Sequence, residues 1–337
     1  MIRLATRLAE GIASGLAALS LSATTLFAAC EGTDLINALP AHQKEALVAR
    51  AAQQPHATGI LWHAVRGDAR ITLFGTFHLR HDATEAHLAA LSPFIDAADA
   101  VYLEMSNADA EALQVELAND PSLMFLTEGP TLPDLLGDAD WARLAEEFKS
   151  RNIPPFIAAR FKPIWAAMML GLGPCEAQSG ALEAKGIDTL IGAYAAQAGK
   201  PSQSLEDGAA ILRSLDDVPQ EKQLDMLRLF FDLTIDPDDL MYTTKARYLS
   251  QEIALLWEYS RKVSLEGGGD SAQEDFDMFE EALLTKRNRD WVSVMTSDGF
   301  TGDIFVAVGA AHLPGDRGVL NLLESKGFRI TPLPFSP

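Results

Sequence analysis

Two short segments far apart in the chain carry the same pattern, an apolar strand followed by Gly-x-x-His. They are residues 73–78, with the letters LFGTFH, and residues 307–312, with the letters AVGAAH. Glycine lets the backbone turn or approach a neighbour closely, and the histidine then lies at the carboxyl end of its strand. Ligands bind at that edge of open α/β sheets. If the two strands are neighbours, His78 and His312 face each other across a cleft.

Two glutamates follow short apolar stretches in the same way. Glu104 comes directly after residues 101–103 (VYL), and Glu206 follows Leu205. Imidazoles and carboxylates are the ligands that Zn, Mn or Co accept, and an open coordination position would hold a hydrolytic water. A carboxylate at the start of a helix is also a common structural feature, and Glu206 fits that role well. We therefore expect His78, His312 and Glu104 as metal ligands, with Glu206 as a further candidate.

Two polar residues lie on the apolar face of a helix expected around residues 275–295. Arg287 is four residues from both Leu283 and Trp291, and Asn288 follows it. A buried arginine needs a carboxylate partner or an anionic ligand. Two interpretations stay open. Arg287 forms an internal salt bridge, or Arg287 and Asn288 act in catalysis by polarising a carbonyl or positioning a carboxylate.

Strand-like segments at both ends of the chain position these residues. Residues 59–65 and 69–74 flank a hairpin turn at residues 66–68, and further strands are expected at 99–103, 303–308 and 328–333. The region between about 107 and 297 is mostly helical in pattern, with one short strand at 202–205. These patterns predict an α/β (α+β) fold: one mixed sheet, built from N- and C-terminal strands, with a long helical insertion over about 107–297. We expect a single domain from residue 30 to residue 337.

The beginning of the chain is typical of an exported protein. Arg3 and Arg7 precede an uncharged stretch of small and apolar residues, so we interpret residues 1–29 as a signal peptide. Cys30 follows directly, which leaves a lipid anchor on that cysteine as one interpretation. We favour the other, a disulfide with Cys175, because the chain has two cysteines and exported proteins usually pair them. No later segment is long and apolar enough to span a membrane, so the mature chain is expected to have no transmembrane helix.

Composition excludes several function classes. The 337 residues carry 47 acidic and 27 basic side chains, a formal net charge of −20, and the sequence contains no extended Lys/Arg cluster, since at most two such residues stand side by side. A nucleic-acid surface needs such a cluster, so no nucleic-acid partner is expected. His81, between Arg80 and Asp82, is expected in an exposed turn. The remaining histidines are expected to be surface or packing residues: His42, His56, His63 and His87.

Taken together, these motifs resemble the TraB/GumN family. The resemblance covers the chain from about Cys30 to its end and rests on both Gly-x-x-His segments, residues 102–104 (YLE), 283–288 (LLTKRN) and 306–315 (VAVGAAHLPG). The family is related to the Tiki proteases, which are associated with metal-dependent peptide cleavage using Mn or Co. Its wider relatives are similar to erythromycin-esterase-like and haem-binding folds. The resemblance implies an erythromycin-esterase/ChaN-like fold and a metallopeptidase with His78, Glu104 and His312 at the motif positions.

We therefore expect a metal-dependent hydrolase, foremost a peptidase acting on peptide or protein substrates, secreted or in the bacterial periplasm. A divalent metal (Mn, Co or Zn) would be its cofactor, Glu104 a ligand or general base, and Arg287 and Asn288 further catalytic residues. The alternative is a non-catalytic envelope protein that binds haem, metal or polysaccharide in the same cleft. A metal-free ester hydrolase that uses a histidine and Glu104 is a third interpretation.

Overall fold

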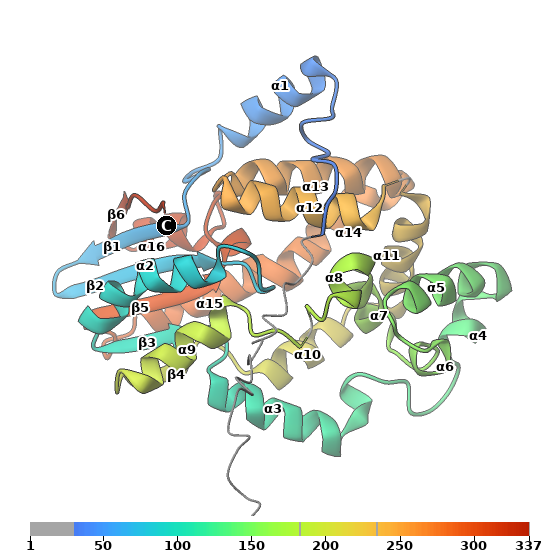
Figure 1. Cartoon of the computed structure of the whole chain (residues 1–337), viewed down its shortest axis with the longest axis horizontal. Coiled ribbons are helices and arrows are strands. Elements are labelled where there is room, and N and C mark those ends of the chain that lie inside the picture. The colour runs from blue at the N-terminus through green and yellow to red at the C-terminus, as the bar shows by residue number, and fades with distance from the viewer. Residues whose placement is uncertain (1–29, 182, 234, 337) are drawn as a thin grey trace, which may run out of the picture.

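The computed structural model describes residues 30–181, 183–233 and 235–336. The proposed signal peptide, residues 1–29, lies outside the described residues. One six-stranded sheet, the left half of Figure 1, holds strands from both ends of the chain side by side. Its strands are β1 (Leu61–Arg66), β2 (Ala69–Thr76), β3 (Ala100–Leu103), β4 (Ser202–Ser204), β5 (Gly302–Gly309) and β6 (Arg329–Pro332).

The strand order is β4-β3-β5-β2-β1-β6, and the first four of these strands are mutually parallel. Strand β1 runs antiparallel to both β2 and β6. β2 and β5 pair along their whole length, from Ala69 opposite Gly302 to Thr76 opposite Gly309. The two Gly-x-x-His segments therefore leave the sheet next to each other, at the carboxyl edge of four parallel strands.

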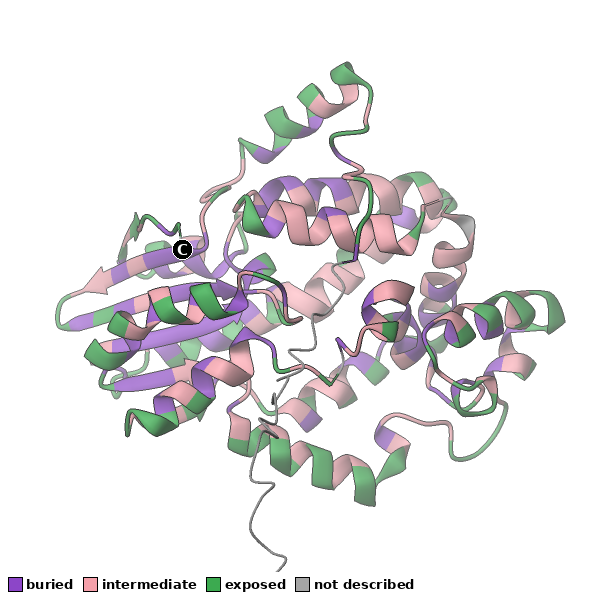
Figure 2. Ribbon diagram, viewed as in Figure 1, coloured by how far each residue is buried: buried purple, intermediate pink, exposed green. Residues whose placement is uncertain are grey.

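Helices cover both faces of the sheet, and this explains the unbroken apolar run of β5. Its side chains alternate between two cores. Ile304, Val306 and Val308 belong to the core on the side of α15 (Lys286–Met295) and α16 (Val319–Ser325). Phe305 and Ala307 belong to the opposite core, against α2 (Thr84–Ala97) and α9 (Ile187–Gln197). Figure 2 shows the resulting band of buried residues along the central strands.

Between β3 and β5 the described chain is helical apart from β4. Several of these helices form a further apolar core away from the sheet, at the right of Figure 1. The helices not yet given are α1 (Ala41–Ala51), α3 (Asn107–Asn119), α4 (Leu132–Leu136), α5 (Asp138–Ser150), α6 (Pro155–Ala158), α7 (Pro163–Leu170), α8 (Pro174–Gln178), α10 (Gly208–Asp216), α11 (Gln220–Asp232), α12 (Pro237–Leu249), α13 (Ile253–Gly267) and α14 (Ala272–Glu280). Short turns of 3₁₀ helix are η1 (Pro121–Leu123), η2 (Gly269–Ser271) and η4 (Ala310–His312), and η3 (Glu281–Thr285) is a π-helical turn that joins α14 to α15.

The predicted fold class is confirmed: a mixed sheet closed by both ends of the chain, with helices between. The predicted disulfide is confirmed as well, since Cys30 is bonded to Cys175 at the start of α8. Among the described residues we find no helix with the length and hydrophobicity that a membrane span requires.

One expectation, the exposure of His81, is wrong. His81 is buried, with 8% of its surface exposed, because the loop after β2 folds back onto α2 and α12.

Candidate functional site

The carboxyl edge of the parallel strands brings the predicted site residues together. Glu104 follows β3 directly, and Glu206 follows β4. His312 ends η4, the turn that continues from β5, and His78 lies two residues beyond β2. The helix α15 runs past this edge, and its first turn supplies Arg287 and Asn288.

Arg287 binds both glutamates. Its Nε and Nη2 donate to the two carboxylate oxygens of Glu206 at 2.9 and 2.5 Å, and Nη2 also donates to Oε2 of Glu104 at 2.7 Å. Nη1 donates to the carbonyl of Leu283 in the π-helical turn η3. The Trp291 indole donates to Glu206 at 2.9 Å. Both oxygens of Glu206 are therefore engaged, so the structure shows this residue as a partner of Arg287.

Glu104 has two differently occupied oxygens. Oε2 accepts from Arg287, whereas Oε1 accepts from the backbone N–H of Gly309 at 2.6 Å and lies 3.8 Å from Nε2 of His312. The side chain is only 15% exposed. A buried carboxylate that accepts several hydrogen bonds, one of them from a guanidinium, is held in its ionised form.

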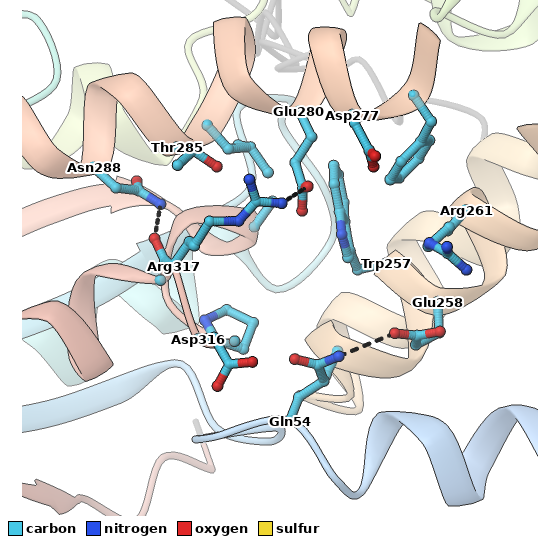
Figure 3. A pocket seen from close by; sticks show the side chains of 17 residues that line it. Gln54, Trp257, Glu258, Arg261, Asp277, Glu280, Thr285, Asn288, Asp316 and Arg317 are labelled. Carbon is cyan, nitrogen blue, oxygen red and sulfur yellow. Dashed lines mark hydrogen bonds and ion pairs between the residues drawn. The ribbon is translucent and has the colours of Figure 1, made fainter. Parts of the chain in front are cut away.

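Asn288 fixes the tautomer of His312. Its amide nitrogen donates to the carbonyl of Arg317 at 2.9 Å, shown in Figure 3, so its Oδ1 faces His312 Nδ1 at 2.6 Å. That oxygen only accepts, and Nδ1 therefore carries the hydrogen. Nε2 of His312 therefore carries a lone pair, on the side where Glu104 and Arg287 lie. The distance from this Nε2 to Nη1 of Arg287 is 3.3 Å. Both Asn288 and His312 are buried.

Asp188, at the first turn of α9, anchors His78. Its Oδ2 lies 3.1 Å from Nδ1 of His78, and its Oδ1 accepts from the Thr76 hydroxyl at 2.7 Å. A carboxylate only accepts, so Nδ1 of His78 is a donor and Nε2 is directed away from Asp188. Gly186 makes this approach feasible, because a Cβ at that position would lie 1.8 Å from the carbonyl oxygen of His78.

Gly309 marks the point where these groups converge. A Cβ there would lie 3.2 Å from Oε1 of Glu104, 3.3 Å from Nε2 of His78 and 3.5 Å from Cδ2 of His312. Contacts at 3.2–3.3 Å would push those atoms back. The lack of a side chain at Gly309 therefore leaves a small space that both histidines and Glu104 border. The two histidines differ in exposure, since the His78 side chain is 63% exposed and that of His312 only 5%.

The comparison with protein families agrees with these residues. The model of the TraB/PrgY/gumN family matches residues 60–332. The chain belongs to this family. The match runs from the start of the sheet to its last strand and includes every residue of the site. No curated protein and no solved structure matches the chain, so the erythromycin-esterase/ChaN-like detail of the fold stays a prediction.

Burial and charge set the protonation of the site in this member of the TraB/PrgY/gumN family. Burial raises the pKa of Glu104, but the neighbouring His312, His78 and Arg287 and the Gly309 N–H outweigh it and lower the pKa to about 2. Burial lowers the pKa of His312 to about 3. A neutral His312 contributes no charge, so the cationic His78, Arg287 and the Gly309 N–H are the groups that keep Glu104 ionised at neutral pH.

The other two titratable groups shift upward. The protein around His78 removes part of the hydration of its exposed ring, which lowers its pKa, but the charge and hydrogen bond of Asp188 outweigh this effect and raise the pKa to about 9. Burial raises the pKa of Glu206, and the hydrogen bonds from Arg287 oppose the change only in part. At neutral pH the site thus contains a cationic His78 and a neutral His312. A metal bound at His78 would have to displace its proton.

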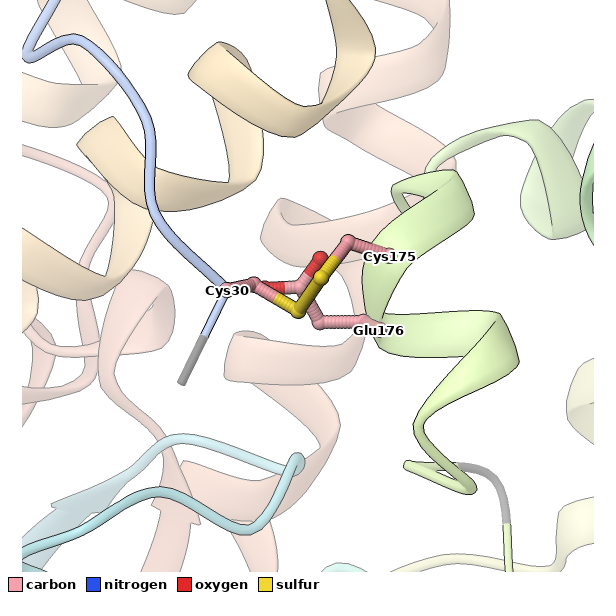
Figure 4. Close-up of side chains that lie close together, drawn as sticks. All are labelled: Cys30, Cys175 and Glu176. Atoms are coloured by element: carbon pink, nitrogen blue, oxygen red, sulfur yellow. A yellow bond between two sulfur atoms is a disulfide. The ribbon is translucent and has the colours of Figure 1, made fainter. Parts of the chain in front are cut away.

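The donor set fits a divalent ion in its chemistry. Both histidines are fixed through Nδ1 by an acceptor, and Nε2 is left on the side of Glu104, which is the usual arrangement of metal-binding histidines. Within the described residues, however, His78, Glu104 and His312 do not bring three ligand atoms within 4.8 Å of one another. A metal would therefore have to draw these side chains inward. The one described group that meets this spacing is Cys30, Cys175 and Glu176. Its two sulfur atoms form the disulfide shown in Figure 4, so neither is available as a thiolate ligand.

Sequence reasoning missed Asp188, Thr76 and the indole of Trp291. Asp188 carries the only available signal, because residues 186–188 (GID) place an acidic residue at the start of a helix, behind a glycine. That pattern is also what an ordinary helix start shows. Its partner His78 lies 110 residues earlier, and nothing local in the sequence indicates the pairing.

Proposed function

We propose that this protein is a metal-dependent hydrolase of the bacterial envelope that cleaves peptide bonds. The observation that carries the proposal is the convergence of His78, Glu104 and His312 on the space beside Gly309, with both imidazoles anchored through Nδ1. His78, His312 and Oε1 of Glu104 would hold a divalent ion such as Mn, Co or Zn. When bound, such an ion supplies a water of lowered pKa and polarises a carbonyl.

The residues of the chain then have separate tasks. Glu104 is ionised and would be a ligand of the ion through Oε1, or else the general base that takes the proton of the attacking water and passes it to the leaving amine as the C–N bond breaks. Arg287 positions Glu104 and Glu206 and keeps both buried carboxylates compensated. Asn288 orients His312. Arg287 and Asn288 are therefore positioning residues in this proposal, and Glu206 holds Arg287 in place.

The location of the protein also belongs to the proposal. The Cys30–Cys175 disulfide is compatible with an oxidising compartment outside the cytoplasm. The disulfide uses the thiol that a lipid anchor on Cys30 would need. We therefore propose a secreted or periplasmic protein that is not lipidated at Cys30.

The direct test is cleavage of a peptide library by the purified protein, with chelator or with added Mn, Co or Zn. We expect cleavage only with metal, and its loss in His312→Ala but not in His42→Ala, a control on an exposed part of α1. Metal-independent cleavage, or cleavage undiminished by His312→Ala, contradicts the proposal. A ligand that is retained without any turnover would instead support the binding-protein alternative.

Gly309→Ala is a sharper test of the geometry. The backbone of Gly309, with φ −52° and ψ 134°, accepts an alanine, but the new Cβ would occupy the space between Glu104 and His78. We expect a folded protein with lost activity and weakened metal binding by calorimetry. Gly299→Ala is the matched control, because no atom lies within 4 Å of a Cβ there. A Gly309→Ala variant that binds metal as tightly as the parent would refute the site.

A further inference from the structure

A cavity of about 320 Å³ opens directly onto the proposed catalytic residues. At one end it is lined by ionisable residues of the site, including His78, Glu104 and Arg287. Apart from Gly208, every other lining residue is aliphatic or a methionine. These come from the end of β3, from α3, α7 and α10, and from the π-helical turn η3.

The apolar wall is exposed where the cavity opens. Met168 on α7 lines it and is 40% exposed, which makes it one of the few large apolar side chains of the described chain that face solvent. Met105, which is half-buried, also lines the cavity, beside Gly208, where a Cβ would come within 2.4 Å of its methyl carbon. Methionine adapts to differently shaped apolar partners. An apolar surface next to reactive groups is typical of a substrate pocket.

The charges at the polar end are already paired within the chain. Both oxygens of Glu206 are engaged by Arg287 and Trp291, and Asp188 is engaged by Thr76 and His78. Every ionisable residue that lines the cavity therefore already has a hydrogen-bonding partner within the chain, although Glu104 and Glu206 share the single guanidinium of Arg287. An unpaired charge in an apolar cavity loses its hydration without compensation.

Size restricts the occupant further. About 320 Å³ is at the lower end of the range for small-molecule sites, roughly 300–1,000 Å³. We propose that this cavity is a specificity pocket for one uncharged aliphatic side chain, such as that of leucine, isoleucine or methionine, next to the bond that is cleaved. The inference rests on the proposed peptidase function, of which it names the substrate class.

Cleavage specificity tests the pocket. In a quenched-fluorescence peptide series that varies one position at a time, we expect leucyl, isoleucyl or methionyl peptides to exceed glycyl, aspartyl and lysyl peptides in kcat/KM. The preference should be at least about tenfold, because apolar pockets discriminate roughly 10- to 200-fold per methylene-sized difference. Met168→Trp, and as a second variant Leu212→Trp, should abolish the preference by filling the pocket. Val115→Trp, at a 62% exposed position of α3, should leave it unchanged.

A binding measurement separates this inference from the proposed catalysis. With ¹³C-methyl-methionine in the full protein, N-acetyl-leucine amide should shift the methyl signals of Met105 and Met168, and N-acetyl-glycine amide should not. The buried Met295, which does not line the cavity, is the internal reference. Such shifts without any peptide cleavage would support the pocket while refuting the peptidase. Cleavage without an aliphatic preference, or equal shifts with both amides, would overturn the pocket and leave the peptidase standing.

Discussion

Acidification should destabilise the folded protein, because two histidines are buried, His81 in the loop that carries His78 and His87 on α2. His81 and His87 are 8% and 4% exposed, with ring centroids 5.1 Å apart. In the described part of the chain, both ring nitrogens of His81 lack a hydrogen-bond partner, and so does Nδ1 of His87. Aromatic rings of Phe77, Tyr248 and Phe335 pack around them. A protonated imidazole there would be an unpaired buried charge.

The magnitude follows from the pKa of His81. Burial lowers it to about 4, and the positive charge of neighbouring groups adds to this effect. The groups that face it are His87, Lys245 and Arg80, which lower the pKa further, and Asp82, which raises it. The fall from 6.5 in the unfolded chain to about 4 corresponds to about 3 kcal/mol. Burial lowers the pKa of His87 as well.

The direction in which stability changes with pH depends on whether the folded or the unfolded chain binds a proton at the higher pH. Between pH 6.5 and 4 the unfolded chain protonates His81 and the folded chain does not, so acid favours unfolding in this window. The stabilisation is fully present above pH 6.5 and disappears as the pH falls to about 4. Glu104 contributes in a lower window, because its folded pKa of about 2 lies below the value of 4.5 in the unfolded chain.

Urea unfolding followed by circular dichroism, from pH 8 to pH 4, measures this effect. The parent protein should lose about 3 kcal/mol more than His81→Leu across that range. Leucine cannot titrate, and it suits the apolar surroundings. His42→Leu, at an exposed position of α1, controls for loss of a histidine in general. Equal slopes for the parent and His81→Leu would show that His81 is not buried as a neutral ring, and would refute the argument.

Three further predictions concern the site and its support. Arg287→Met should lower the free energy of unfolding in urea by about 3–5 kcal/mol, because it leaves two buried carboxylates without a cation. The added change Glu206→Gln should restore part of that free energy. A loss below about 1 kcal/mol would contradict this ion-pair network. Asp188→Asn should lower activity or metal affinity roughly 10- to 100-fold with the fold intact by circular dichroism, because His78 loses its anchor; an unchanged affinity would show that the anchor is unimportant. Cys175→Ser should reduce the free energy of unfolding by about 2–5 kcal/mol, since the lost disulfide closes a loop of 145 residues; a stability equal to that of the parent would count against a formed bond.

The sheet could be predicted from the sequence because its signals are local. The hairpin at residues 66–68, the apolar run at 303–308 and the repeated Gly-x-x-His motif each specify an element and its end. The repeated motif made the pairing of β2 with β5 the condition for His78 and His312 to face each other, and the structure pairs these two strands. The disulfide could be favoured for a simpler reason, because only two cysteines are present, although a lipid anchor on Cys30 stayed open at the level of the sequence.

The missed features depend on contacts that no local pattern records. Polar neighbours on both sides of His81 indicate an exposed turn, but the loop folds back and α2 and α12 cover the ring. Glu206 and Asp207 also show that a local pattern predicts local contacts but not distant ones. Asp207 is the N-cap of α10 and accepts from the Ala210 N–H, as the local pattern predicts. Glu206, one residue earlier, binds Arg287, 81 residues later.

The two carboxylate oxygens of Glu104 have different partners, and this difference decides on which side of Glu104 the proposed metal could bind. Arg287 occupies Oε2, and a second cation on that side would meet the guanidinium at close range. Oε1 faces Gly309 and the side where Nε2 of both histidines lies. In the proposed hydrolase a divalent ion would therefore lie in the space beside Gly309, on the side of Glu104 away from Arg287, and Arg287 would keep Glu104 ionised. The same guanidinium explains why the buried arginine is both a salt bridge and a part of the site. The two interpretations of Arg287 that the sequence left open are consequently compatible.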